Sequence, residues 1–362
     1  MALRSRYYKY KLKFNFDAGT SRGMLKEKHT YFLKVWDTAN PEIFGLGEAG
    51  PLVGLSVDDR DDFEPKLSEV CSQLEQFDLQ AFNNEYQSIV SKLAGSGFPA
   101  IRFALETALM DMVNGGERII YPNAFKDSTF TIPINGLVWM GDIDFMLEQI
   151  DKKIKQGFDC IKVKIGALNF DEELSVLAHI RDNFTPEQIT LRVDANGAFS
   201  VEEAPSKLEK LASYDIHSIE QPIQPGQDEA MRSLCDSQIL PIALDEELIG
   251  IDDPNAKSEL LSKINPQYII LKPTLVGGLS ASSEWINTAE DQGIGWWITS
   301  ALESNIGLNA ISQYTALANV DMPQGLGTGQ IYQNNISSPL QIHNGNLVYN
   351  QKSEWDLSPV FG

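Results

Sequence analysis

The chain is poor in cysteine and in basic residues. Only three cysteines occur among 362 residues, and Cys71, Cys160 and Cys235 lie far apart with no CxxC pair. This excludes a disulfide framework and favours a reducing compartment, so we expect a cytoplasmic protein. Lysine and arginine number 29 against 50 acidic residues, for a formal net charge of −21. The acidic excess argues against partners such as nucleic acid or an anionic membrane.

Long apolar runs are also missing. No stretch reaches the roughly 18 apolar residues that suggest a membrane-spanning helix. The first residues, RSRYYKYKLKFNF, alternate apolar with basic side chains, unlike the unbroken apolar run of a signal peptide. A period of two predicts a β-strand, and a second alternating run from Thr30 to Val35 predicts another.

The chain divides into an amino-terminal α+β part, a long α/β part and a short tail. After the two strands, GLGEAGP at residues 45–51 interrupts the strand pattern, and helical periodicity follows at 58–76, 79–95 and 99–114. We therefore predict a capping domain over 1–130, a barrel over 131–330, and a tail over 331–362 that packs back on the capping domain. A complete (β/α)8 barrel takes about 250 residues, so roughly 110 of the 362 would remain for a second domain.

From residue 131 short apolar strands alternate with amphipathic helices. This order is typical of parallel βαβ units, and eight such strands favour a closed TIM-like barrel over an open sheet. The predicted strands are 131–137, 161–166, 189–195, 217–222, 241–246, 268–273, 295–301 and 325–329.

Three acidic residues fall at the ends of three successive predicted strands. Asp194, Glu220 and Asp245 are 26 and 25 residues apart, about one βα unit each. The carboxyl ends of barrel strands converge on one mouth, where active sites lie. One acid alone would more often be structural or a helix cap, but three in this register indicate a site.

Three clustered carboxylates repel one another unless a cation joins them. An all-oxygen set suits a hard ion, so we predict Mg²⁺, with Mn²⁺ able to substitute. Zinc is disfavoured because no histidine of the chain lies at a predicted strand end of this mouth.

Lysines flank the acids on both sides. Lys162 and Lys164 lie two apart and share one face of their strand, while Lys272 ends the strand after Asp245. Such a KxK pair usually marks a solvated edge, but here it lies within an apolar strand, where purposeless burial is costly. Arg192 and Asn196, two before and two after Asp194, should also point inward.

This arrangement suits removal of a proton from the carbon next to a carboxylate. A cation that binds the substrate carboxylate stabilises the doubly charged enediolate most in the transition state. A neutral lysine can take the proton. The expected partner is therefore a small-molecule carboxylate.

The motifs resemble the enolase superfamily, in its muconate-cycloisomerase-like subgroup. KVK (162–164), VDANG (193–197), IEQP (219–222), LDEE (244–247) and LKPTLVGG (271–278) match in order and spacing. The resemblance covers nearly the whole chain. It implies an α/β fold: a TIM-like (β/α)7β barrel under an amino-terminal α+β capping domain.

Within the subgroup, TSALESNIG (299–307) and GLGTGQIY (325–332) are most similar to the o-succinylbenzoate synthases of menaquinone biosynthesis. The resemblance implies dehydration of 2-succinyl-6-hydroxy-2,4-cyclohexadiene-1-carboxylate to 2-succinylbenzoate. It implies Lys164 as the base and then the acid, with Lys272 stabilising the enediolate from the opposite face. It also implies Mg²⁺ on Asp194, Glu220 and Asp245.

The remaining implied site residues surround that centre. Arg192, Asn196 and Glu246 would support the metal site, and the first two are also candidates for substrate binding. Ser300 and Glu303 are expected substrate contacts, and Gly327 of GLGTG would allow close substrate approach. Cap loops near 17–28 and 51–56, with Arg22, Gly23 and Met24 as candidates, would close over the barrel and select the substrate.

Rival functions stay open. An N-succinylamino acid racemase shares this machinery, and so does a dipeptide epimerase, although GLGTG lacks the usual Asp-x-Asp. Lys272 alone could serve an aldolase as a Schiff-base lysine, and a barrel can persist as a non-catalytic binding protein. The sequence leaves the oligomeric state open, a homo-oligomer included.

Overall fold

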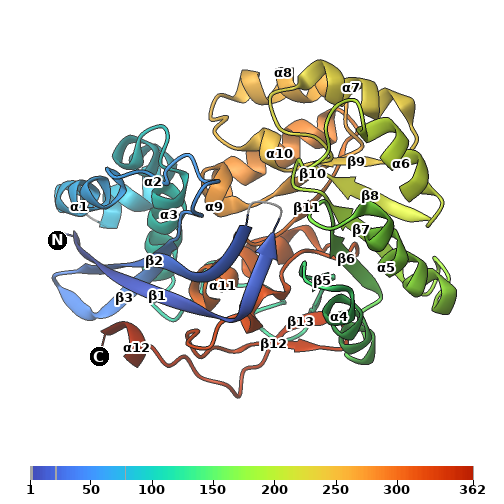
Figure 1. Ribbon diagram of the computed structural model, residues 1–362. Coiled ribbons are helices and arrows are strands. Elements are labelled where there is room, and N and C mark those ends of the chain that lie inside the picture. Colours follow the sequence, from blue (N-terminus) through green and yellow to red (C-terminus); the bar gives the residue numbers. More distant parts are fainter. Residues whose placement is uncertain (1–2, 21–22, 78, 362) are drawn as a thin grey trace.

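The computed structural model describes residues 3–20, 23–77 and 79–361. A cap and a barrel lie side by side, and the described chain begins and ends next to the cap (Figure 1). The cap is an antiparallel sheet in the order β1-β2-β3, covered by three helices. Its elements are β1 Leu3–Thr20, β2 Gly23–Asp37, β3 Asn40–Ala49, α1 Phe63–Leu74, α2 Leu79–Ala94 and α3 Pro99–Val113.

The third cap strand contradicts the sequence prediction. GLGEAGP was expected to interrupt the strand pattern, yet β3 continues to Ala49. Its glycines serve helix packing: a Cβ on Gly45 would lie 1.7 Å from the Ala108 carbonyl oxygen, and one on Gly47 would lie 2.0 Å from that of Ala104. Helix α3 therefore lies directly on the strand, at a distance that no larger residue permits.

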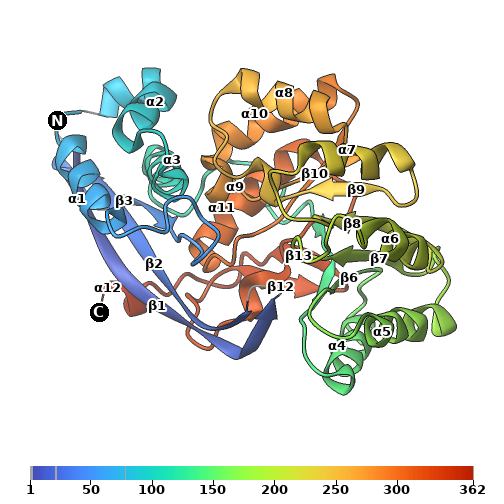
Figure 2. The same ribbon diagram turned by 45° about the horizontal axis from the view of Figure 1, so that its top comes forward.

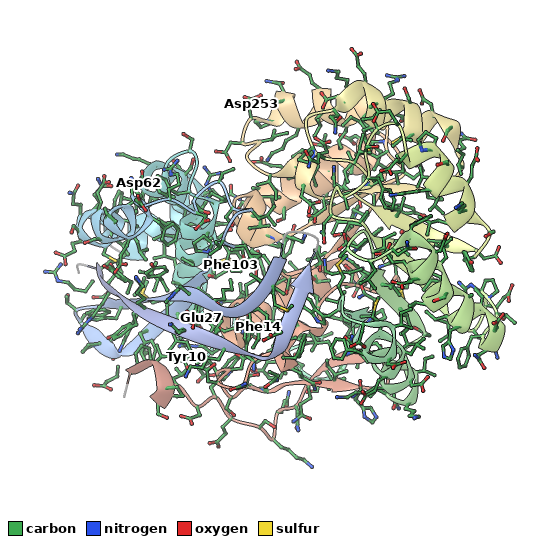
Figure 3. All side chains as sticks on the ribbon, viewed as in Figure 1. Tyr10, Phe14, Glu27, Asp62, Phe103 and Asp253 are labelled. Atoms are coloured by element: carbon green, nitrogen blue, oxygen red, sulfur yellow. The ribbon has the colours of Figure 1, made fainter. Side chains whose placement is uncertain are left out.

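Helix α3 joins the two parts of the molecule. It is apolar on nearly every side, which is typical of a helix buried all round. Ala104 and Leu105 pack in the cap core, whereas Phe103 belongs to the barrel core (Figure 3). The cap is therefore held firmly against the barrel.

The barrel is a curled parallel sheet with helices outside it (Figure 2). Neighbouring strands follow chain order, as expected for repeated βα units: β5 Gly136–Val138, β6 Cys160–Lys164, β7 Thr190–Asp194, β8 Ile216–Glu220, β9 Ile242–Leu244, β10 Tyr268–Leu271 and β11 Gly295–Ile298. The α-helices between and after them are α4 Ile143–Lys155, α5 Phe170–Asn183, α6 Ala204–Ala212, α7 Asp228–Ser237, α8 Pro254–Ile264, α9 Pro273–Val276, α10 Gly278–Asp291 and α11 Asn305–Thr315.

The predicted eighth strand, 325–329, is not a regular strand. Parallel bridges join Gln324 to Ile134 and Gly325 to Thr299, so two residues close the sheet between its edges. The glycine-rich remainder turns into the 3₁₀ helix η3, Gly327–Gln330. Of the described helices, none is both long and apolar enough to span a bilayer.

The tail after residue 330 contacts both parts of the molecule. Tyr332 bridges Phe14 of β1, with ring centroids 4.8 Å apart. The hairpin of β12 Leu340–His343 and β13 Asn346–Tyr349 pairs with β4, Ile132–Pro133, at the start of the barrel. The last helix, α12 Ser358–Phe361, places Val360 in a cluster with Phe32 of the cap. Domain boundaries near residues 130 and 330 stay a prediction.

Candidate active site

The three acidic residues meet at the mouth of the barrel. Asp194 and Glu220 end β7 and β8, and Asp245 follows β9. Parallel register pairs Lys164 with Asp194 and Asp194 with Glu220, so their side chains leave the sheet at one level. Each acidic residue is at most 2% exposed. Strand spacing and register alone therefore bring the cluster together.

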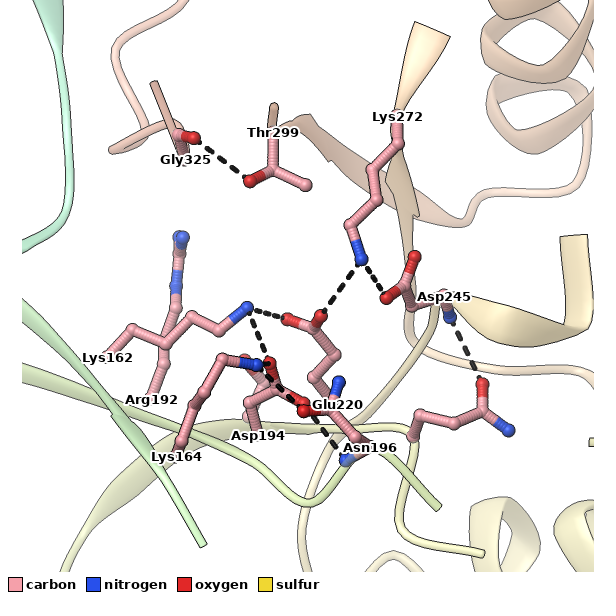
Figure 4. Close-up of polar contacts among 12 residues, drawn as sticks. Lys162, Lys164, Arg192, Asp194, Asn196, Glu220, Asp245, Lys272, Thr299 and Gly325 are labelled. Atoms are coloured by element: carbon pink, nitrogen blue, oxygen red, sulfur yellow. Dashed lines mark hydrogen bonds and ion pairs between the residues drawn. The ribbon is translucent and has the colours of Figure 1, made fainter. Parts of the chain in front are cut away.

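Lysine ammonium groups lie between these carboxylates (Figure 4). Lys162 Nζ is 3.0 Å from Asp194 Oδ2 and contacts Glu220 Oε2. Lys164 Nζ is 2.9 Å from Asp194 Oδ2. Lys272 Nζ contacts Asp245 Oδ2 and is 3.9 Å from Glu220 Oε1. Opposite charges thus alternate across the mouth.

Burial and neighbouring charge set the ionisation of this cluster. Burial opposes the charge of Asp194, but Lys162 and Lys164 outweigh it and lower its pKa well below the usual range. Burial and then the charge of Asp194 raise the pKa of Glu220. For Lys162 and Lys272, burial is outweighed by the carboxylates, which raise both pKa values. Asp194 is therefore ionised, and Lys162 and Lys272 are protonated, at neutral pH.

Strained backbone follows two of the acidic strand ends. Asn196 has φ +45° and Gln221 has φ +40°, a left-handed region that costs most L-residues about 1–2 kcal/mol and that asparagine tolerates better. The turn places the Asn196 amide between two site residues: its Oδ1 accepts from Lys164 Nζ at 2.7 Å, and its Nδ2 donates to Glu246 Oε1 at 3.1 Å. Asn196 and Glu246 thus lie beside the acidic cluster, where the sequence predicted supporting residues.

The turn after Lys164 is held by a residue that the sequence analysis missed. Glu173 of α5 accepts hydrogen bonds from the backbone N–H groups of Gly166, Ala167 and Leu168 at 2.7, 3.0 and 3.0 Å. Three amides on one carboxylate fix the loop and hence the base of the Lys164 side chain. An acidic residue in the first turn of a helix gives no sequence signal that separates this role from ordinary capping.

A cavity of about 500 Å³ opens above the cluster, between cap and barrel. Its charged lining residues, within the part of the chain that the structure describes, are Lys162, Lys164, Lys272 and Asp194. Cap residues 23–25 and 52–55 form one wall. Apolar and small polar residues of the barrel form the rest: Asn135, Leu137, Trp139, Asn196, Thr299, Ser300, Ala301, Leu302, Gly325, Gly327 and Thr328. The cavity therefore offers excess positive charge at one end and an apolar enclosure at the other.

Three of the predicted substrate contacts line the cavity: Asn196, Ser300 and Gly327. Gly23 and Met24, two of the predicted cap residues, line it too. The third cap candidate, Arg22, lies outside the described residues.

Arg192 and Glu303 are not among the residues that line the cavity, so their role as substrate contacts stays a prediction. Arg192 does point inward, but one layer lower: its guanidinium lies 4.2 Å from the Trp297 ring and donates to the Pro323 carbonyl at 2.8 Å. Glu303 is fully buried and accepts from Thr274 Oγ1 at 2.5 Å and from the Ala301 N–H at 2.8 Å. Both side chains support neighbouring segments from below the cavity surface.

The donor set suits a hard divalent cation. Three carboxylates are buried together, and Glu220 Oε1 accepts no hydrogen bond from the described residues. Among the described residues, no three acidic side chains are already arranged to hold a metal ion. Lysine ammonium groups lie between the three carboxylates instead. A cation among these oxygens would therefore replace Lys162 and Lys272 as the partner of the carboxylates.

Comparison with known proteins shows the family to which the chain belongs. Residues 146–353 match the family described as enolase C-terminal domain-like. The chain is 45% identical over 362 residues to o-succinylbenzoate synthase of Desulfotalea psychrophila, with 94% of this chain and 97% of that protein covered. The crystal structure of MenC from Desulfotalea psychrophila has a TM-score of 0.86 and 41% identity, covering 96% of this chain and all of that chain (100%).

A more distant structure shares the fold alone. The dipeptide epimerase of Enterococcus faecalis V583, complexed with Mg and the dipeptide L-Leu-L-Tyr, has a TM-score of 0.83 at 19% identity, covering 99% of each chain.

Proposed function

Because the chain belongs to the o-succinylbenzoate synthases of the enolase superfamily, we propose that it dehydrates 2-succinyl-6-hydroxy-2,4-cyclohexadiene-1-carboxylate to 2-succinylbenzoate. It is a lyase, and we place this step in menaquinone biosynthesis. The observation that carries the proposal is a cavity lined by three lysines and one carboxylate, which suits a substrate with two carboxylate groups.

We assign a Mg²⁺ site to Asp194, Glu220 and Asp245, with Asn196 and Glu246 in support and Mn²⁺ as a substitute. When bound, the ion would neutralise charge that develops on the substrate carboxylate. The positive charge of the ion and of the lysine ammonium groups together suits a dianionic substrate.

Lys164 is the proposed base. Its Nζ lies within hydrogen-bond distance of Asp194 and Asn196 and borders the cavity. As a neutral amine it takes the proton from the ring carbon next to the carboxylate. The resulting ammonium then returns a proton to the leaving hydroxyl, the C–O bond breaks, and water departs from an aromatic ring. Aromaticity makes this elimination favourable, so the site has only to make the enediolate accessible.

Lys272 and Lys162 act through charge. Lys272 reaches the cluster from the opposite side of the barrel and remains a cation, so we assign it to the negative charge on the carboxylate oxygens. Lys162 touches both Asp194 and Glu220 when no metal ion lies among their oxygens.

N-succinylamino acid racemisation is the second candidate. Lysines on opposite sides of the cluster favour it, because one can remove a proton and the other return it to the opposite face. Dipeptide epimerisation is less favoured: residues 325–329, which lie at the cavity, hold no acidic side chain for an ammonium group. We also propose a cytoplasmic location, which the three free cysteines support.

An ultraviolet assay of diene loss, with Mg²⁺ and with EDTA, tests the proposal beside a racemisation assay on N-succinylamino acids. Fast, EDTA-sensitive loss of the diene with much slower racemisation is the expected result. Fast racemisation with slow diene loss would move the substrate to an acylated amino acid while leaving the lysines and acids in their assigned roles.

A further inference from the structure

One wall of the cavity has a strained backbone. Leu302, in the segment between β11 and α11, has φ +61° although it is not glycine. Its side chain lines the cavity and packs with Trp139 and Leu25 in one apolar cluster. A left-handed leucine persists only where its surroundings hold it, and such residues concentrate at functional sites.

Three hydrogen bonds hold this residue. The Leu302 carbonyl oxygen accepts from Lys28 Nζ at 3.0 Å and from the Tyr332 hydroxyl at 2.7 Å. The Leu302 N–H donates to Ser300 Oγ at 3.1 Å. The two donors come from the cap strand β2 and from the tail, 274 and 30 residues away along the chain. Three distant segments thus meet at one peptide of the cavity wall.

The side chain of Lys28 is almost completely buried. It is 5% exposed, and within the described residues its ammonium donates one hydrogen bond, to Leu302. Glu48 and Glu303 supply nearby negative charge. The surroundings also leave room for it, because a Cβ on Gly50 would lie 2.6 Å from Lys28 Nζ. A buried lysine is costly, and an apolar residue would fill the space with less penalty.

We propose that Lys28 is a positioning residue that sets the shape of the substrate cavity by holding the Leu302 carbonyl. The same strand carries Leu25, which lines the cavity and packs against the apolar cluster that contains Leu302, so β2 provides both a cavity wall and its anchor. In Figures 1 and 2 the β1–β2 hairpin extends from the cap toward the barrel. The inference rests on the proposed function for its substrate, but not for its geometry.

Replacement of Lys28 by methionine, which keeps the length and removes the donor, tests the proposal. Because Leu302 shapes the cavity and takes no part in the proposed proton transfer, we expect KM for the cyclohexadiene carboxylate to rise about tenfold while kcat changes less than about twofold. Lys34→Met is the matched control: Lys34 lies on the same strand, 4.0 Å from the Phe44 ring, and its loss should leave both constants unchanged. A lower melting temperature with unchanged KM would make Lys28 merely structural and overturn the proposal.

A second variant removes the other hydrogen-bond donor to the Leu302 carbonyl. Tyr332→Phe removes only the hydroxyl donor, so it should raise KM in the same direction and decides the matter if Lys28→Met does not fold. In the double variant the increase in KM should be smaller than the product of the two single increases, because both act through one carbonyl. Independent, fully multiplicative effects would contradict a shared anchor.

Amide hydrogen exchange separates this inference from the proposed function. Peptides covering residues 299–307 should exchange faster in Lys28→Met than in the wild type or in Lys34→Met, with no substrate present. If the wild type does not turn over the diene but this difference in exchange appears, the proposed function is wrong and the proposed role of Lys28 is supported. Unchanged exchange of residues 299–307 would contradict the role of Lys28, whichever substrate the enzyme uses.

Discussion

Replacement of Glu220 by glutamine should abolish turnover without harming the fold. Glu220 lies at the centre of the cluster, between Lys162 and Lys272, and provides one of the three proposed metal ligands. Glutamine keeps the size of the side chain and one acceptor oxygen, but removes the negative charge. Binding of a dication would then weaken, because a neutral amide replaces a carboxylate that the ion would hold in its ionised form.

The direction of the stability change follows from the pKa of Glu220. Burial and Asp194 raise that pKa, so the folded protein disfavours the ionised form near neutral pH. Glutamine removes this penalty, which amounts to about 1.4 kcal/mol for every tenfold change in the proton affinity of the carboxylate. Lys162 keeps Asp194 as a partner at 3.0 Å. We therefore expect a melting temperature equal to or above that of the wild type.

Catalysis should fall for the opposite reason. A metal contributes several kcal/mol of transition-state stabilisation, so kcat should drop about a thousandfold or more. Diene loss measures kcat, Mn²⁺ titration by electron paramagnetic resonance measures metal affinity, and differential scanning fluorimetry measures stability. Glu106→Gln is the control, because Glu106 is equally buried but caps α10 and does not line the cavity. Full turnover, or a large loss of stability in Glu220→Gln, would refute the assignment.

Other perturbations give separate tests. Lys164→Ala should lower solvent proton exchange at the substrate carbon by about 10²–10⁴-fold, measured by NMR in D₂O, and persistent exchange would make Lys272 the base. EDTA should abolish turnover, and added Mg²⁺ should restore it, with circular dichroism unchanged; activity that survives chelation would exclude a required metal. Burial raises the pKa of Asp58 from 3.8 to about 7, so the folded state binds the extra proton and stability should fall as pH rises through that window. The melting temperature of Asp58→Asn minus that of the wild type should therefore be larger at about pH 8 than at about pH 5. An equal difference at the two pH values would refute this assignment.

The sequence determined the fold class and the position of the acidic cluster. The barrel under an α+β cap is confirmed by the family match and by the MenC structure. Acidic residues one βα unit apart must reach one mouth when every strand runs parallel, and a period of two places Lys162 and Lys164 on one face. These features are local periodicities, so a single chain displays them.

What only the tertiary structure decided depends on contacts between distant segments. The glycines of β3 have meaning only once α3 packs on them, and the barrel closes through two residues because both sheet edges approach Gln324 and Gly325. Arg192 faces inward as expected, but its length takes the guanidinium to Trp297, away from the cavity. Lys28 meets Leu302 across 274 residues of chain. No spacing or composition encodes such a contact, because only packing of the cap on the barrel brings the two segments together.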